Sequence, residues 1–147
     1  MKLHSILTIS FILISGLIPK LSLAQTCLVN SGTLNNGITI YTEVFEYDYV
    51  DVKPEFPGGG TSLVNFINSN RKYPKEAYDL GIQGKVTCSF VVNIDGKLSH
   101  LNVLRGVEPS LNNEALRIIS EMPEWTPGFI HGEPVPVRVI CNIPFRK

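Results

Sequence analysis

The side chains best suited to catalysis in this sequence are two histidines, His100 and His131. His100 falls within an expected strand and has no nucleophile or acid partner at a catalytic spacing. His131 stands two residues before Glu133 in a glycine-containing loop, where such a pair is more often a solvated turn than an acid–base dyad. The sequence holds no Gly-x-Ser-x-Gly nucleophile motif. We therefore expect a protein that is not an enzyme and needs no cofactor.

Three cysteines, Cys27, Cys88 and Cys141, are the other candidates for chemistry. None has the spacing of a zinc-ligand pair, so we expect no metal site. Cys88 and Cys141 occupy apolar positions of two expected strands, where cysteine usually serves as a small buried side chain. If the two stand opposite each other, a cross-strand disulfide can form instead. With an odd number of thiols, at least one stays unpaired within a single chain.

The charge balance excludes one large class of partners. The chain carries 13 basic and 13 acidic residues, for a formal net charge of zero. A protein that neutralises phosphates needs a clear excess of Lys and Arg, so we expect no nucleic-acid partner. With 44% hydrophobic residues the chain can build a core, which also excludes an acidic disordered protein.

Residues 1–24 have the layout of a secretory signal peptide. A charged start is followed by an apolar run over 6–18, and the small residues Ser22 and Ala24 precede a suitable cleavage point. The run is shorter than the about 20 residues that span a bilayer, but an uncleaved N-terminal membrane anchor is the alternative. Cleavage predicts an exported protein, and retention predicts one that stays anchored in a membrane. Removal of Lys2 and Lys20 with this leader leaves 11 basic against 13 acidic residues.

Two segments precede the regular part of the chain. Residues 25–52 lack proline and are rich in β-forming side chains, which predicts an extended arm or an extra strand. Residues 53–60, KPEFPGGG, are punctuated by prolines and glycines and indicate a lead-in to a domain. The glycines are not followed by Gly-Lys-Ser/Thr, so they do not predict a phosphate-binding loop.

The remaining residues alternate between helical and extended periodicity. We expect a helix capped by Thr61 or Ser62 that ends at Tyr73-Pro74, a turn over 75–80, strands over 84–92 and 97–105 joined by Asp95-Gly96, a helix capped by Ser110 that ends at Pro123, and a last strand over 135–145.

The order of these elements predicts an α+β fold. The tight hairpin makes the first two strands antiparallel, and the helical crossover returns the third strand beside the first and antiparallel to it. We expect a three-stranded antiparallel sheet, in the order second, first, third, with two helices packed on one face.

In this topology the last strand is an edge whose backbone can pair with another chain. Pro136 and Pro144 have the same parity, and a strand tolerates proline where its missing N–H would face the open side. The even residues Arg138, Ile140 and Asn142 would then present their backbone groups outward. The alternative is that the prolines only protect this edge from aggregation.

Residues 53–147 resemble the C-terminal domain of TonB, the periplasmic energy transducer of Gram-negative bacteria. The resemblance is carried by an ordered series of motifs: KPEFPGG at 53–59, Tyr73-Pro74 with Ala77, GIQGKV at 81–86, FVVNIDGK at 90–97, Val103–Gly106, the helix 114–117, MPEWTPG at 122–128, and the final strand ending Ile143-Pro144-Phe145.

This resemblance implies the fold of TonB and TolA C-terminal domains and a binding function. Such domains hold the TonB box, a short extended segment of outer-membrane receptors, as a strand added at the last strand. The carried-over binding residues are Val137, Arg138, Val139, Ile140, Cys141 and Asn142. Trp125 is expected to brace a corner of the core.

The chain also departs from the full-length pattern of TonB. Residues 25–52 are too few to form the long spacer that such a transducer uses to cross the periplasm. Contact with inner-membrane motor proteins is expected only if the leader stays uncleaved. The alternative function is an envelope scaffold or adaptor that forms a homodimer, or binds another protein, through the same edge strand.

Overall fold

The computed structural model describes residues 26–33, 37 and 39–147, so the expected leader, residues 1–24, lies outside the described residues. The elements follow the chain in the order β1 (Thr26–Thr33), β2 (Thr39–Glu46), the 3-10 turn η1 (Tyr47–Tyr49), α1 (Gly59–Asn70), α2 (Lys75–Asp79), β3 (Gly84–Val92), β4 (Leu98–Arg105), α3 (Pro109–Ser120), β5 (Gly128–Ile130), β6 (Glu133–Val135) and β7 (Val137–Phe145). Among the described helices, none is both long enough and apolar enough to cross a bilayer.

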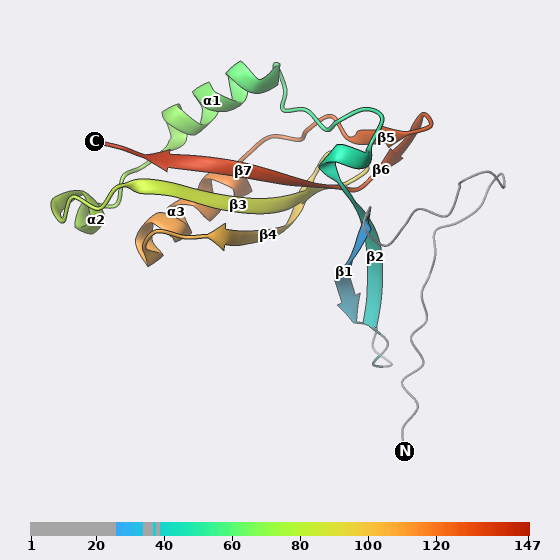
Figure 1. Cartoon of the computed structure of the whole chain (residues 1–147), viewed down its shortest axis with the longest axis horizontal. Coiled ribbons are helices and arrows are strands. Elements are labelled where there is room, and N and C mark those ends of the chain that lie inside the picture. Colours follow the sequence, from blue (N-terminus) through green and yellow to red (C-terminus); the bar gives the residue numbers. More distant parts are fainter. Residues whose placement is uncertain (1–25, 34–36, 38) are drawn as a thin grey trace.

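The main sheet is mixed and has five strands in the order β1-β2-β7-β3-β4 (Figure 1). The predicted order of the last three is correct, because β7 and β4 both pair antiparallel with β3. The prediction of a three-stranded antiparallel sheet is wrong, because β1 and β2 form a hairpin and β2 pairs parallel with β7. The α+β class holds, with α2 as a third, short helix.

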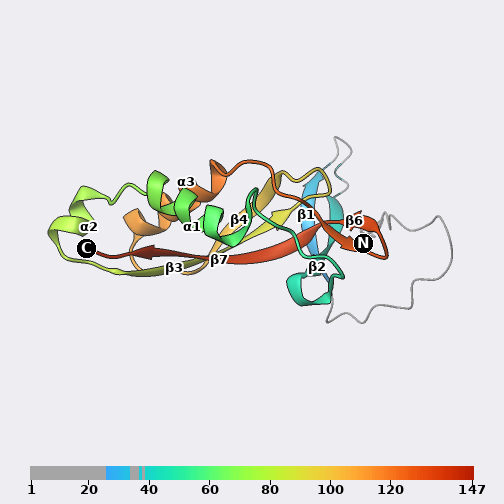
Figure 2. The same cartoon turned by 90° about the horizontal axis from the view of Figure 1, so that it is seen from above.

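Buried and outward-facing side chains alternate along β7, and the buried ones form part of the core. Its odd residues from Val137 to Phe145 are buried, and those from Val139 on pack in one cluster with the buried residues of β3 and α3. Helices α1 and α3 lie on the same side of this sheet, over the odd-numbered face (Figure 2). The even residues of β7 therefore face the opposite side of the sheet.

Several expected boundaries are wrong for local reasons. The helix α1 begins at Gly59, after Gly58 in a left-handed conformation, and neither Thr61 nor Ser62 caps it. Glu108 caps α3 through hydrogen bonds from the N–H groups of Ser110 and Leu111, with Pro109 in the first turn. The last strand begins at Val137, because Val135 belongs to the separate β5–β6 hairpin.

The β1–β2 hairpin, which we call the arm, runs steeply across the direction of β7 (Figure 1). It reaches β4, where His100 Nε2 lies 2.8 Å from the carbonyl oxygen of Asn30. His100 has a positive φ of 52°, at a register shift in the pairing of β3 with β4. This bulge turns the histidine out of the regular alternation and towards the arm.

Candidate functional site

The outer edge of β7 presents the backbone groups of its even residues. The N–H of Phe45 donates to the carbonyl of Pro136 across 2.9 Å, on the side away from β3. Arg71 Nη1 donates to the carbonyl of Pro144 across 2.5 Å. These two bonds confirm that the prolines, and with them Ile140 and Asn142, direct their backbone groups away from β3.

The first two residues of this edge are already covered. Phe45 pairs with Val137 and Glu46 pairs with Arg138, so the expectation that the whole last strand is a free edge is wrong. The cause is the arm, whose parallel pairing no local pattern in the sequence signals. Within the described part of the chain, no strand pairs with this side of β7 after Arg138.

The open part of the edge, which we call the window, comprises Val139–Ile143. It is bounded by the arm at one end and by Arg71 on the carbonyl of Pro144 at the other. Ile140 is 57% exposed although it is a large apolar residue in the middle of a strand. Five residues extend about 17 Å, enough for one short added strand.

An ion pair fixes the arm at the start of the window. Arg138 Nε lies 3.2 Å from Glu46 Oε2, and Arg138 Nη2 donates to Glu46 Oε1. The two residues are neighbours in the parallel pair, so their side chains leave the sheet on the same face. This bidentate contact is stronger than a simple exposed pair, because the planar guanidinium matches both carboxylate oxygens.

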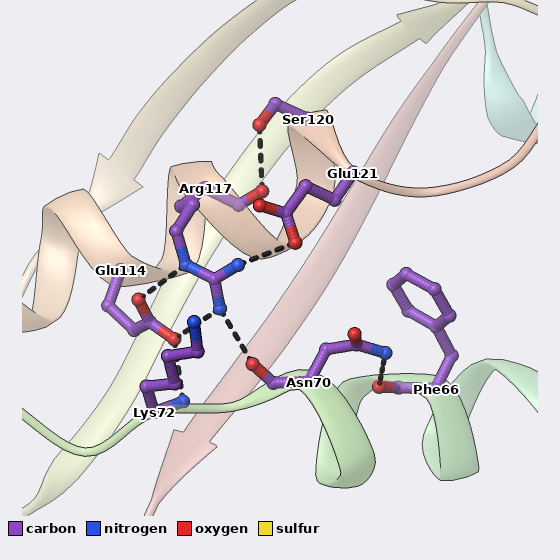
Figure 3. A network of polar contacts seen from close by, with 7 residues as sticks. All are labelled: Phe66, Asn70, Lys72, Glu114, Arg117, Ser120 and Glu121. Atoms are coloured by element: carbon purple, nitrogen blue, oxygen red, sulfur yellow. Dashed lines mark hydrogen bonds and ion pairs between the residues drawn. The ribbon is translucent and has the colours of Figure 1, made fainter.

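A polar network joins the C-terminal end of helix α1 to helix α3 (Figure 3). Arg117 of α3 donates to the carbonyl of Asn70 across 2.6 Å and to both oxygens of Glu114. The carboxylate of Glu114 also accepts the N–H of Lys72 across 2.7 Å. Burial raises the pKa of Glu114, but the bonds from Arg117 and Lys72 outweigh it and hold that pKa below its ordinary value.

A groove of about 710 Å³ opens beside the window. Its apolar lining comes from the lead-in, α1, the α3–β5 connection and β7, through Phe56, Leu63, Trp125, Val139 and Ile140. The arm and η1 add polar side chains: Glu46, Tyr47 and Asp48. Phe56 and Trp125 are 7% and 6% exposed and meet edge to face, so the base of the groove is firmly packed.

The two strand cysteines stand directly opposite each other, because Cys88 pairs with Cys141 in the antiparallel register. Burial raises the pKa of each thiol to about 11, and for Cys141 the neighbouring Cys88 adds to the rise. Cys27 is separate from them, since it pairs with Val44 in the arm. Both strand thiols are free in this structure, and a disulfide between them stays a prediction.

Of the described histidines, His100 and His131, neither meets an acid and a nucleophile among the described residues. His100 is bonded to the arm and to Ser99 Oγ, while His131 Nδ1 lies 3.8 Å from Asp51 at the surface. Across the described residues, no group of three or more His, Cys, Asp or Glu side chains could hold a metal ion. The β7 window is the candidate site that combines an open strand edge with an apolar groove.

Comparison with known families identifies the domain. Residues 69–146, more than half of the chain, match the family described as the Gram-negative bacterial TonB protein C-terminal. The chain belongs to the TonB C-terminal domain family. This is a family of periplasmic, non-enzymatic domains that serve energy transduction and binding.

Solved structures of TonB are also similar. Two solution structures of the Helicobacter pylori TonB C-terminal domain match at 27% and 26% identity, with TM-scores of 0.43 and 0.41. The matches cover 58% and 62% of this chain, and 90% and 88% of those domains. No curated protein sequence matches the chain.

Some residues of the candidate site were not predicted from the sequence. Glu46 and Phe45 lie in the arm, and nothing in their spacing predicts a parallel pairing 92 residues away. Arg71 looks like a surface cation in the sequence, but it bonds the backbone of β7. The sequence offered one indication for Phe56. It is the single aromatic residue in the lead-in KPEFPGGG, which suggests that it packs against the domain.

Proposed function

We propose that this TonB-like domain binds outer-membrane TonB-dependent receptors by adding their TonB-box segment as a strand to β7, and so supports energy-coupled transport. The observation that carries the proposal is the window itself. Ile140 and Asn142 lie between two residues whose outward carbonyls are already bonded, Pro136 and Pro144. Backbone pairing of this kind supplies affinity without requiring one fixed sequence in the partner.

Family membership supports the same proposal, because TonB C-terminal domains in general interact with outer-membrane receptors. In this chain the arm reduces the number of β7 residues that are open to a partner. Val137 and Arg138, which the family resemblance places in the binding strand, are engaged by β2, so the proposed site narrows to Val139, Ile140, Cys141 and Asn142. A periplasmic location is part of the proposal, with an inner-membrane anchor and contact to motor proteins as the alternative.

Titration with TonB-box peptides tests the proposal. Protein prepared from cells that express the full chain is labelled with ¹⁵N, and amide shifts are followed as peptide is added. We expect the largest shifts at residues 139–143. Shifts confined to other elements would contradict the site. A tight dimer by light scattering that ignores the peptides would instead support the scaffold function, which uses the same edge for a second copy.

A further inference from the structure

The groove beside the window is placed to meet one side chain of an added strand. It shares Val139 and Ile140 with the window, so the two surfaces are continuous. Residues that stand directly opposite each other on neighbouring strands put their side chains on the same face of the sheet. Val139 faces the helix layer, together with Phe56 and Trp125 of the core cluster. An added residue opposite Val139 therefore points to the helix side, where Leu63 and Phe56 line the groove.

The charges around the groove restrict what that side chain can be. Two cations line the groove, and both already have partners. Arg138 pairs with Glu46, and Lys53 donates to the carbonyl of Tyr47 and pairs with Asp48. Glu55 adds a further carboxylate to the lining. An acidic side chain would lose its hydration there without gaining a counter-ion, whereas an apolar one would only replace water.

The groove has room for such a side chain. Its volume of about 710 Å³ is larger than any single amino-acid side chain. Leu63 is only partly buried, so an apolar group that enters on the helix side would remove apolar surface of the protein from water.

We propose that this groove is a specificity pocket, which takes one large aliphatic or aromatic side chain from the partner residue paired opposite Val139. The inference rests on the proposed function, since it requires a strand added at β7. It goes further by naming the chemistry of one partner position and by assigning the selection to Leu63 and Phe56. It also gives the arm and η1 a role, because Glu46 of the arm and Tyr47 and Asp48 of η1 line the groove.

The test compares two neighbouring residues of α1. Leu63 lines the groove, whereas Val64 is 55% exposed and lies outside the lining. Calorimetric titration with a TonB-box peptide is carried out on Leu63→Glu and on the matched control Val64→Glu. We expect Leu63→Glu to weaken binding roughly tenfold or more and Val64→Glu to leave the Kd within about twofold. A thermal unfolding midpoint close to that of the unmodified protein shows that each variant is folded.

A second measurement guards against a variant that fails to fold. Each residue of the peptide is replaced by alanine, and the series is repeated on the milder variant Leu63→Ala. The proposal predicts one large apolar peptide residue whose loss costs roughly tenfold in the unmodified protein and clearly less in Leu63→Ala, because the two side chains touch. Equal losses in both proteins, or equal binding by the two glutamate variants, would overturn the pocket and leave strand addition standing. Absence of peptide binding to the unmodified protein would instead overturn the proposed function.

Discussion

The guanidinium of Arg138 and the carboxylate of Glu46 join the arm to the first residues of β7 by two hydrogen bonds. The pair lies at the point where β2 stops covering the outer edge of β7. It therefore sets where the open window begins, one residue later at Val139. The arm therefore bounds the proposed binding site, although the resemblance to TonB begins only after it.

Replacement of Glu46 by alanine should loosen the arm without unfolding the domain. The pair is partly exposed, with side-chain exposures of 40% for Arg138 and 27% for Glu46, so we expect a loss of about 0.2–1 kcal/mol. Amide hydrogen exchange provides the readout, because Phe45 N–H donates to Pro136 and should exchange faster in Glu46→Ala. Glu43→Ala is the control, since Glu43 accepts a hydrogen bond from Thr26 Oγ1 within the hairpin and does not belong to the Arg138 pair. Equal protection of Phe45 in both variants would show that the ion pair does not hold the arm.

Glu114 should make the domain sensitive to acid. Its pKa is lower in the folded protein than its ordinary value of 4.5, so its stabilising effect is present above that value and is lost as the pH falls through the folded pKa. Glu114→Gln should cost about 2 kcal/mol at pH 7, because it removes charged hydrogen bonds to Arg117 and Lys72. Urea unfolding should show this difference shrinking below pH of about 4.5. A difference that stays constant to pH 3 would contradict this role.

Replacement of Gly96 by alanine tests how tightly the β3–β4 turn packs against the α3–β5 connection. Its φ is +82°, and an added Cβ would lie 2.2 Å from the carbonyl oxygen of Trp125. Gly132 is a matched control, because its φ is +81° but nothing lies within 4 Å of an added Cβ. We expect Gly132→Ala to cost about 1–2 kcal/mol for the left-handed backbone alone, and Gly96→Ala to cost more by about 1–3 kcal/mol. Equal free energies of unfolding for the two variants would mean that the turn moves freely.

The thiols should react slowly in the folded protein. Burial raises the pKa of Cys88 and Cys141 to about 11, and the thiolate is the reactive form. At pH 8 we expect both to resist alkylation until the protein unfolds. Mass spectrometry of unreduced, denatured protein then counts the thiols. Three free thiols would rule out the Cys88–Cys141 disulfide, and one free thiol at Cys27 would establish it.

A proline substitution tests whether the partner uses the outward N–H of Ile140. Ile140→Pro removes the central outward N–H of the window while leaving the bonds to β3, and the chain already carries prolines of the same parity at 136 and 144. We expect the variant to fold and to lose peptide binding. Ile140→Ala, which shortens the side chain but keeps the N–H, should still bind. Binding by the proline variant would show that the partner does not use this edge.

The sequence predicted those parts of the fold that depend on local pattern. The alternation of β7 and the outward parity of Pro136 were readable, because each follows from the period of a strand and the missing N–H of proline. The order of β3, β4 and β7 followed from the hairpin and the crossover. The N-cap of α3 was predicted wrongly. The pattern favoured Ser110, but the helix begins at Pro109 and Glu108 caps it.

Features that depend on tertiary contacts were not predictable. The arm pairs with β7 through only two residue pairs, so no long run of matched positions in the sequence signals it. The Arg71 contact with Pro144 spans 73 residues and involves a side chain that suits any surface. These two contacts define both ends of the window. The sequence therefore predicted the last strand and the direction of its backbone groups, and the structure shows which of its residues remain open.

Hydrogen exchange at two amides tests the central claim most directly. The N–H groups of Ile140 and Asn142 point to the open side of β7, so in the free protein they should exchange rapidly, unlike those of Val139 and Cys141, which face β3. Addition of a saturating TonB-box peptide should protect Ile140 and Asn142 at least about tenfold, because an added strand bonds them directly. Saturating peptide that leaves the exchange of both amides unchanged would contradict strand addition at β7.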